Sequence, residues 1–417
     1  MYELLCLIFI KCRRLVRIII NCDLCLQIEI TLNNTVEMKK ILLFICLSLM
    51  TIPIFVSAED LASNATSAIL MEYSTGKILF EKNANEELPM ASMTKVMTLL
   101  LTMDAIEEGR ISYDDMVTIS KNAASMGGSQ MFLEENSQVK LEELIKGVSV
   151  ASANDGAVAL AEYVGGSVDN FVNLMNEKAK SLGLEHTHFA NPHGLDAQDH
   201  YSSAYDMAIM ALNLIHHQDI LRFTSIYEDY FNKPDGTRTW LVNTNKLVRF
   251  LPGVDGLKTG YTEDAGYCLT ATAKKQDIRF ISVVMGEPTS TIRSKETTAL
   301  LNYAFNSFKL NTILEENKEL GTIEIEKGMQ DKATLIVKKS ITELISKNDK
   351  PEEYSYNIKV NKVKAPINSG QTVGIVEILD NEGLVVREEE LTIKENIKKA
   401  TLWHIFKNNF KTILSGK

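Results

Sequence analysis

Hydrophobic and polar positions follow two periods along this chain, and the period changes between its segments. Around residues 67–82 ("SAILMEYSTGKILFEK") apolar runs flank a polar turn that contains Gly76, which predicts a β-hairpin. Apolar residues then recur at helical spacing in a run that opens near Ser92 and ends at Gly109. Further helical runs occupy much of the segment 141–218.

From about residue 254 the pattern returns to strand type. The β-branched, alternating runs are "GLKTGYT", "AGYCLTATA" and "IRFISVVMGE", and the amphipathic helix pattern "SKETTALLNYAFNSF" follows them. Strands at both ends of a region with helices between them predict one α+β domain over residues 59–314. We expect its N- and C-terminal strands to share an antiparallel sheet flanked by helices.

Residues 315–392 have a different character, because short alternating runs such as "GTIEIEKG" and "QTVGIVEI" replace the helical pattern. This predicts a small all-β domain. The tail, residues 393–417, places Leu402, Trp403 and Phe406 at helical spacing opposite lysines. It is too short and too charged to span a bilayer, so it predicts a C-terminal amphipathic helix on a membrane surface. A terminal helix docked on its own domain is the alternative.

The N-terminus has the pattern of a targeting segment. A basic start at Met38 precedes an apolar core at residues 41–56 and a small-x-small cleavage site after Ala58. This is typical of a secretory signal peptide, so we expect residues 1–58 to be a leader and the mature chain to act at the extracytoplasmic face of a bacterial cell membrane. Export does not need the first 37 residues, so we expect translation to start at Met38. An unusually long leader is the alternative.

Cysteine and charge content refine this interpretation. Five of the six cysteines lie in the predicted leader, so Cys268 alone remains, and we expect it to be a small buried hydrophobe. The net charge is −10 for the chain, +2 for the leader and +5 for the tail, which leaves −17 for the body. An acidic body argues against nucleic acid as a partner, and a cationic aromatic tail favours an anionic membrane surface.

The stretch "LPMASMTKVMTLLL" carries the first candidate chemistry. Ser92 and Lys95 stand at i and i+3, so both side chains share one face of the first helical turn. A lysine among apolar residues at a helix N-terminus is favoured in its neutral form, and it can then take the proton of a nucleophilic serine. The first-turn N–H groups would supply part of an oxyanion hole. Alone, the pair also fits an N-cap serine with a lysine that extends to solvent.

A second polar group interrupts an apolar helical run at Ser152, Ala153 and Asn154. A hydroxyl and an amide at this point can relay a proton and hold a substrate amide. The alternative is that Ser152 or Asn154 simply caps the following helix.

A third group, Lys258, Thr259 and Gly260, opens a predicted strand. The cation and the hydroxyl suit a carboxylate, and Gly260 lets a ligand backbone approach closely. The alternative is an ordinary turn before a strand.

Ser-x-x-Lys, Ser-x-Asn and Lys-Thr-Gly in this order are the motif set of penicillin-recognising serine enzymes. The chain resembles the low-molecular-mass penicillin-binding proteins that act as D-alanyl-D-alanine carboxypeptidases. The resemblance spans residues 67–392 and includes "LEELIKGVSVASANDGAVALAE", "NPHGLDAQDHYSSAYDMA" and "DGLKTGYTEDAGYCL". Ala153 stands where some members have Asp, and Tyr261 where some have His.

The resemblance implies a mechanism. Ser92 would attack the carbonyl between the two terminal D-alanines of a peptidoglycan stem peptide, with Lys95 as the base. The N–H groups of Ser92 and Tyr261 would hold the oxyanion, and Ser152 would pass a proton to the departing amine. Asn154 would hold the peptide amide or orient Lys95. Penicillin and other β-lactams would acylate the same serine.

The resemblance also assigns Lys258 and Thr259 to the terminal carboxylate of the substrate. It implies that neither a metal nor a cofactor is needed. It leaves open a D,D-endopeptidase that acts on cross-links with the same chemistry. A non-catalytic β-lactam sensor or wall-binding protein is the interpretation from another class, and the intact Ser92, Lys95 and Ser152 argue against it.

Two other enzyme classes fit the sequence less well. A class A β-lactamase would need a Glu-x-x-Leu-Asn segment between Asn154 and Lys258, and none is present. Histidines gather between His186 and His200, but no cysteine or acidic residue completes a recognisable zinc spacing. The segment "NPHGLD" there reads as a turn.

Overall fold

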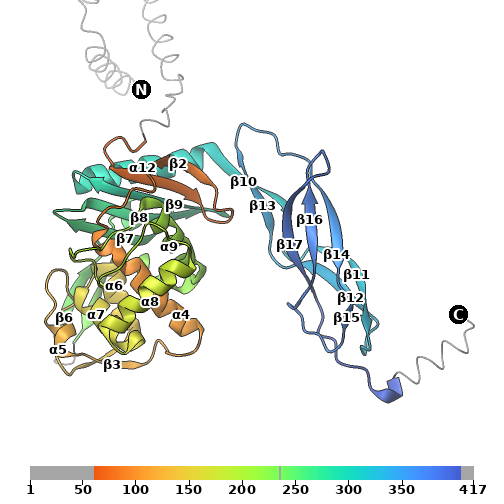
Figure 1. Ribbon diagram of the computed structural model, residues 1–417, viewed down its shortest axis with the longest axis horizontal. Helices are drawn as coiled ribbons and strands as arrows, with labels where there is room; N and C mark the ends of the chain where they lie inside the picture. Colours follow the sequence, from red (N-terminus) through yellow and green to blue (C-terminus); the bar gives the residue numbers. More distant parts are fainter. Residues whose placement is uncertain (1–60, 234–235, 405–417) are drawn as a thin grey trace, which may run out of the picture. The chain divides into compact units, whose positions relative to one another are not determined.

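The computed structural model describes residues 61–233 and 236–404 (Figure 1). The predicted leader and residues 405–417 of the predicted tail lie outside these ranges. Leu402 and Trp403, at the start of the tail, are 88% and 73% exposed. Within the described ranges, no helix has the length and apolarity needed to cross a membrane.

The first domain is built on an antiparallel sheet in the order β2-β1-β9-β8-β7. Its strands are β1 (Ser67–Glu72), β2 (Ile78–Lys82), β7 (Val254–Thr262), β8 (Gly266–Lys275) and β9 (Ile278–Glu287). The hairpin at the start of the domain therefore joins strands from its end, with Ser67 opposite Met285. The predicted α+β class with a shared antiparallel sheet is confirmed.

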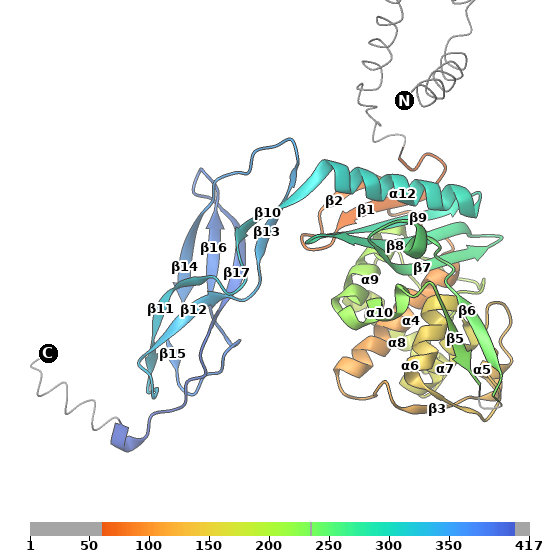
Figure 2. The same ribbon diagram turned by 180° about the vertical axis from the view of Figure 1, so that it is seen from behind.

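Both faces of this sheet are covered, which explains the apolar character of β1. Ile69 and Met71 point into one core, whereas Ala68 and Leu70 point into the other. Helix α12 (Ser290–Ser307) packs on one face, and α9 (Ala204–His216) packs on the other (Figure 2).

The helical layer below the sheet holds the first motif. The helix predicted from Ser92 begins as a 3-10 turn, η3 (Ala91–Thr94), and continues as α4 (Lys95–Glu107). Helix α4 is buried on nearly all sides, as expected for a helix in the middle of a core. The same part of the domain contains α5 (Lys121–Ala124), α6 (Leu141–Ala151), α7 (Asn154–Gly165), α8 (Val168–Ser181), α10 (Leu221–Thr224), the paired strands β3 (Met116–Thr118) and β4 (Gln138–Lys140), and the hairpin β5–β6 (Glu228–Asn232, Arg238–Val242).

The second domain is all-β, as predicted. It contains a sheet in the order β14-β16-β17-β12-β11-β15 and a pair β10–β13. These strands are β10 (Phe308–Leu314), β11 (Glu319–Glu326), β12 (Lys332–Val337), β13 (Ile341–Ser346), β14 (Ser355–Val360), β15 (Val363–Lys364), β16 (Thr372–Leu379) and β17 (Val385–Ile393).

The predicted boundaries at residues 314 and 392 stay predictions. Strand β10 follows α12 directly and pairs with β13. Ile397 is 2% exposed and packs in the same core as Ile393. The apolar positions just after residue 392 therefore contribute to the β domain.

Candidate active site

Ser92 and Lys95 lie where the 3-10 turn passes into α4. The Nζ atom of Lys95 is 2.9 Å from the Oγ atom of Ser92. Ser92 is not a helix cap, because Met90 and Thr94 occupy the N-cap positions of η3 and α4 and neither makes a side-chain capping bond. The i, i+3 spacing therefore brings the side chains of Ser92 and Lys95 into contact and has no role in capping the helix.

Lys95 is fully buried, and its Nζ atom has polar neighbours on three sides. Besides Ser92 it contacts Oδ1 of Asn154 at 2.8 Å and the backbone carbonyl of His193. Burial holds the pKa of Lys95 well below its usual value, and the nearby charge of Lys258 lowers this pKa further. The side chain is therefore suited to exist as a neutral amine.

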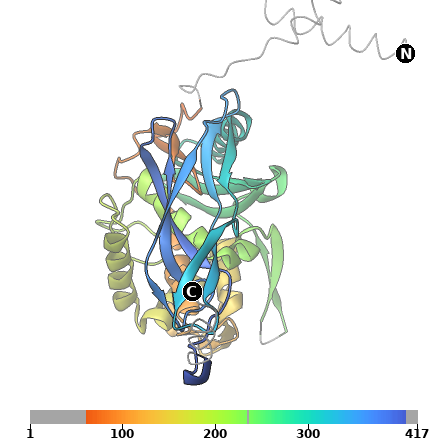
Figure 3. The ribbon, with the colours of Figure 1, turned by 90° about the vertical axis from the view of Figure 1, so that its right-hand side faces the viewer.

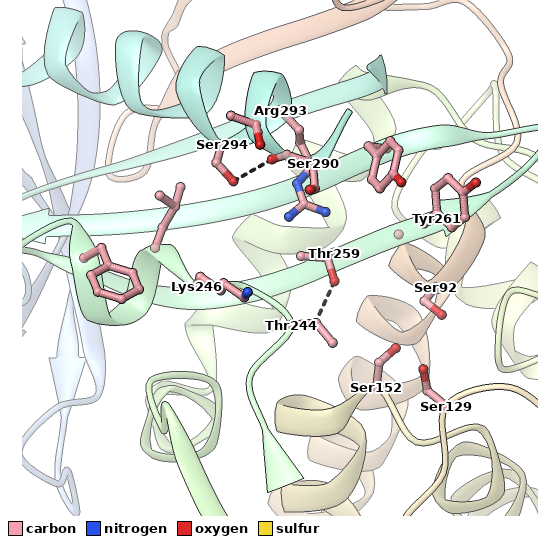
Figure 4. A pocket seen from close by; sticks show the side chains of 15 residues that line it. Ser92, Ser129, Ser152, Thr244, Lys246, Thr259, Tyr261, Ser290, Arg293 and Ser294 are labelled. Carbon is pink, nitrogen blue, oxygen red and sulfur yellow. Dashed lines mark hydrogen bonds between the residues drawn. The ribbon is translucent and has the colours of Figure 1, made fainter. Parts of the chain in front are cut away.

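The second motif occupies the junction between α6 and α7. Ser152 has φ +62° and ψ +32°, a left-handed conformation that ends α6, and Asn154 is the first residue of α7. Of the alternative that Ser152 or Asn154 only starts the second helix, Asn154 does begin α7, but neither side chain caps it, because Ala153 holds the N-cap position without a side-chain bond. The break in the helix instead turns Ser152 toward Ser92 (Figure 4).

Asn154 and its neighbour Asp155 fix a loop, residues 127–133, which we call the active-site loop. The Nδ2 atom of Asn154 donates to the carbonyl of Gly127 at 2.8 Å. The buried carboxylate of Asp155 accepts hydrogen bonds from the backbone N–H groups of Met131 and Leu133. The sequence analysis did not identify Asp155, although an acidic residue in an apolar helical run is a detectable signal.

The third motif lies inside β7, not in a turn before a strand as one alternative held. Successive side chains of β7 point to opposite faces, so those of Thr259 and Tyr261 line the pocket and that of Lys258 does not, while Gly260 also lines the pocket. A Cβ atom on Gly260 would lie 2.7 Å from the carbonyl oxygen of Met90. Gly260 therefore allows β7 to approach the turn that carries Ser92, and this close neighbour is protein rather than ligand.

Lys258 is 1% exposed, and its Nζ atom donates to the carbonyl of Thr259 at 2.9 Å. Burial, assisted by the charge of Arg293, lowers the pKa of Lys258 to about 7. The predicted contact with a substrate carboxylate does not follow from this position. The side chain acts on Lys95 through its charge.

A pocket of about 650 Å³ opens beside these motifs (Figure 4). The hydroxyl groups of Ser92, Ser129 and Ser152 gather at one end of it. Thr259 donates to Thr244 at 2.7 Å along its wall. The described lining residues include the cations Lys246 and Arg293 but no carboxylate. An anionic group is therefore the ligand that this wall favours.

Arg293 is the residue of this wall that sequence reasoning missed. It lies in the first turn of α12 and is 7% exposed. Its Nε atom has no hydrogen-bond partner among the described residues. The signal was present, because Arg293 shares a helical face with Thr297 and Leu300, both buried. A buried guanidinium that faces a pocket and whose Nε atom has no hydrogen-bond partner among the described residues is suited to bind a carboxylate.

The segment "NPHGL" supports the nucleophile from the other side. Asn191 Oδ1 accepts hydrogen bonds from the N–H groups of His193 and Gly194, as in a turn. A Cβ atom on Gly194, where φ is +88°, would lie 1.9 Å from the carbonyl oxygen of Ala91. The segment thus packs directly on η3.

The remaining candidates have structural roles. Burial lowers the pKa of both His193 and His200 to about 4, so both rings are neutral. In the described part of the chain, no three His, Cys, Asp or Glu side chains are grouped to hold a metal. Cys268 is fully buried in β8, as predicted.

Comparison with known proteins agrees with this site. A family model described as D-alanyl-D-alanine carboxypeptidase matches residues 55–289, and one described as the penicillin-binding protein 5 C-terminal domain matches residues 308–399. D-alanyl-D-alanine carboxypeptidase DacF of Bacillus subtilis (strain 168) is 45% identical over 343 residues, which are 82% of this chain and 88% of the relative. DacC of Escherichia coli (strain K12) is 37% identical over 358 residues, or 82% and 87%.

Solved structures of penicillin-binding proteins also resemble this chain. Penicillin-binding protein 5 from Haemophilus influenzae is 34% identical, with a TM-score of 0.64 over 81% of this chain and 98% of the other. Ampicillin-bound penicillin-binding protein D2 from Listeria monocytogenes is 30% identical, with a TM-score of 0.52 over 58% and 98%. With a serine at one end of its pocket and a buried lysine in contact with that serine, the chain belongs to the D-alanyl-D-alanine carboxypeptidase family of serine hydrolases, and the predicted family and activity are confirmed.

Proposed function

We propose that the protein removes the terminal D-alanine from peptidoglycan stem pentapeptides through an acyl-enzyme on Ser92. The observation that carries this proposal is the 2.9 Å contact between Ser92 Oγ and the buried Nζ atom of Lys95. Burial supplies what a lysine base needs, a lone pair at neutral pH.

A neutral Lys95 accounts for all its neighbours. Its two N–H bonds can donate to Oδ1 of Asn154 and to the carbonyl of His193, which are acceptors only. The lone pair then faces Ser92 and receives the hydrogen bond of the hydroxyl. In this role Asn154 orients Lys95, and its Nδ2 atom holds Gly127. These contacts favour orientation of the base over contact with the substrate amide.

The reaction would proceed in two steps. Ser92 Oγ attacks the carbonyl carbon between the terminal D-alanines while its proton moves to Lys95. Ser152, beside Ser92 in the pocket, gives its proton to the leaving nitrogen and takes up the proton held by Lys95, so the C–N bond breaks, D-alanine departs and Lys95 is neutral again. A water molecule then hydrolyses the ester, with Lys95 again as base. A β-lactam would acylate Ser92 in the same way, since its leaving nitrogen stays tethered.

Backbone and cationic groups would stabilise the charges. Ser92 lies at the start of η3 and Tyr261 lies on an edge strand of the sheet, so both can direct N–H groups at the developing oxyanion. Thr259 and Arg293 would bind the terminal carboxylate, which replaces the expected pairing of Thr259 with Lys258. Lys258 would instead keep Lys95 neutral through repulsion.

The decisive experiment is mass spectrometry of the purified protein incubated with pentapeptide monomers and cross-linked dimers, with Ser92→Ala as the control. Loss of one alanine from the pentapeptides by the parent protein alone is the expected result. Labelled penicillin should mark the parent and not Ser92→Ala. Conversion of dimers to monomers would favour an endopeptidase. If neither substrate changes while penicillin still labels Ser92, the protein is a sensor.

The endopeptidase is the second candidate, and one similarity supports it. D-alanyl-D-alanine endopeptidase of Escherichia coli (strain K12) is 30% identical over 217 residues, which are 51% of this chain and 67% of the relative. The match is shorter than those to the carboxypeptidases, so we favour the carboxypeptidase.

We also propose that the protein is exported and held on the membrane surface by its tail. The apolar run at residues 41–56, the six lysines against one glutamate in residues 393–417, and the exposure of Leu402 support this. A chain that ends at Ala400 keeps Ile397 and its core contacts and is the proper test variant. It should appear in the soluble fraction of cells in which the parent is membrane-bound. A truncated protein that stays on the membrane would contradict the anchor.

A further inference from the structure

The hairpin β5–β6 has one buried face and one exposed face. Phe231 and Leu241 on its inner face are 3% and 0% exposed. On its outer face Tyr230 and Trp240 are directly opposite each other across the two strands, and they are 42% and 58% exposed. Adjacent strand partners have Cβ atoms about 5 Å apart, so the two rings form one surface. We call Tyr230 and Trp240 the aromatic platform.

Polar groups accompany these rings without giving the face a strong charge. The guanidinium of Arg238 lies 4.4 Å from the centre of the Tyr230 ring, and Asn232 is its partner across the hairpin. Glu228, on the same face, pairs with Arg249 at 3.8 Å. Flat rings beside amide and guanidinium donors match a ligand that has an apolar ring face and many hydroxyl groups. The face therefore suits a neutral sugar better than an anionic lipid or nucleic acid.

The hairpin is fixed to the catalytic site by its inner face. Thr239 Oγ1 donates to the carbonyl of Met131 in the active-site loop at 3.1 Å. Lys146 of α6 pairs with Asp229 at 2.9 Å and donates to the carbonyl of Tyr230 at 3.2 Å. These contacts join the hairpin, a long green ribbon in Figure 3, to the loop that Asn154 holds.

We propose that the aromatic platform binds the glycan strand of peptidoglycan while a stem peptide of that strand occupies the pocket. This rests on the proposed function. A pentapeptide extends at most about 17 Å, so sugars attached to a bound stem can only reach elements near the pocket. The hairpin β5–β6 meets this condition through Met131, because it contacts the loop whose Ser129 lines the pocket. A protein partner would need roughly 800 Å² per side, which is more than two rings provide. Each stem peptide of the polymer is attached to the glycan strand, so sugars are always present next to a bound stem. Weak contacts between these sugars and the platform therefore add to the affinity of the pocket for the stem peptide.

Tryptophan fluorescence can test this directly, because the chain has two tryptophans, Trp240 and Trp403. In a Trp403→Phe variant, Trp240 is the sole reporter. Titration with peptide-free glycan strands should change its emission in a saturable way, and the soluble oligosaccharide of N-acetylglucosamine should act as a weaker ligand. Absence of any change with either glycan would overturn the proposal. A response only to peptide-bearing strands would also overturn it, in favour of a peptide-binding surface.

Kinetics supply the second test. In Trp240→Ala, KM for D-alanine release from polymeric peptidoglycan should rise roughly three- to tenfold, the loss expected for one ring contact. The values for a soluble acyl-D-Ala-D-Ala peptide should not change, and Trp240→Phe should restore KM. Tyr356→Ala, which removes an aromatic residue of the β domain that is 47% exposed, is the matched control.

Equal losses on both substrates would mean that the hairpin acts only through the active-site loop, which contradicts glycan binding. Labelling of Ser92 by penicillin and turnover of the soluble peptide are measured on the same samples. If the parent fails these two assays, the proposed function has failed. If it passes them while KM for the polymer is the same in Trp240→Ala, only the glycan platform has failed.

Discussion

Arg293→Met tests the assignment of the substrate carboxylate. The change removes a guanidinium that is 7% exposed and has an unpaired Nε atom, and it keeps a long side chain in the same space. The pocket wall would keep Thr259 and its shape but lose its buried cation. We expect folding to survive, because removing a buried guanidinium whose Nε atom makes no hydrogen bond relieves a desolvation cost, and the raised pKa of the neighbouring Glu287 favours its neutral form.

The magnitude follows from the contacts available. One hydrogen bond between charged groups in a desolvated site contributes about 1.5–3 kcal/mol, so kcat/KM for a carboxylate substrate should fall roughly 10- to 150-fold. A peptide with a C-terminal amide cannot use this contact. For the parent protein, kcat/KM should therefore be higher for the peptide with a C-terminal carboxylate than for the amide by this factor. For Arg293→Met, kcat/KM should be nearly the same for the two peptides.

The assay measures D-alanine or D-alaninamide release from matched acid and amide peptides by the parent, Arg293→Met and the surface control Arg110→Met. Arg110 is half exposed, so its removal should leave the preference unchanged. If Arg293→Met loses activity equally on both peptides, the residue has a structural role only. If the preference persists in full, another group, such as Lys246, binds the carboxylate.

Three further predictions follow from the buried charges and the tight packing. Lys258→Met removes the cation that lowers the pKa of Lys95, so the acid limb of the kcat/KM profile should shift to higher pH; an unchanged limb would exclude this coupling. Gly194→Ala places a methyl group against the carbonyl of Ala91, so penicillin acylation and thermal stability should both fall, and unchanged acylation would mean that η3 tolerates the shift. Burial and a neighbouring carboxylate raise the pKa of Glu287 from 4.5 to about 8, so the folded protein binds this proton more tightly than the unfolded chain does. The resulting contribution to stability is fully present below pH 4.5 and is lost as the pH rises through 8. Glu287→Gln should therefore gain in Tm over the parent at pH 9 and not at pH 4, and equal Tm differences at the two pH values would contradict the raised pKa.

The contacts that the sequence predicted well are local ones. Ser92 and Lys95 meet because three residues separate them on a helical turn, and this geometry needs no knowledge of the rest of the fold. The same holds for the β1–β2 hairpin. The β-branched, apolar runs of β8 and β9 also identified these strands, but their burial does not alternate, because both faces of the sheet are covered.

The features that the sequence did not reveal depend on distant packing. Arg293 reaches the pocket only because α12 crosses the far end of the sheet. The face that Lys258 presents depends on the register of β7, where a shift by one residue reverses every side chain. The left-handed conformation of Ser152 is uncommon for a residue other than glycine, and propensity does not predict it.

The pairing of β1 with β9 also has a consequence for the order of folding. Ser67 and Met285 are neighbours in space but are separated by most of the domain in sequence. A growing chain can form the β1–β2 hairpin early, but the other edge of β1 stays unpaired until β9 has left the ribosome. Closing such a long loop makes this pairing slow relative to local contacts. The central pairing of the sheet is therefore among the last contacts that a nascent chain can make.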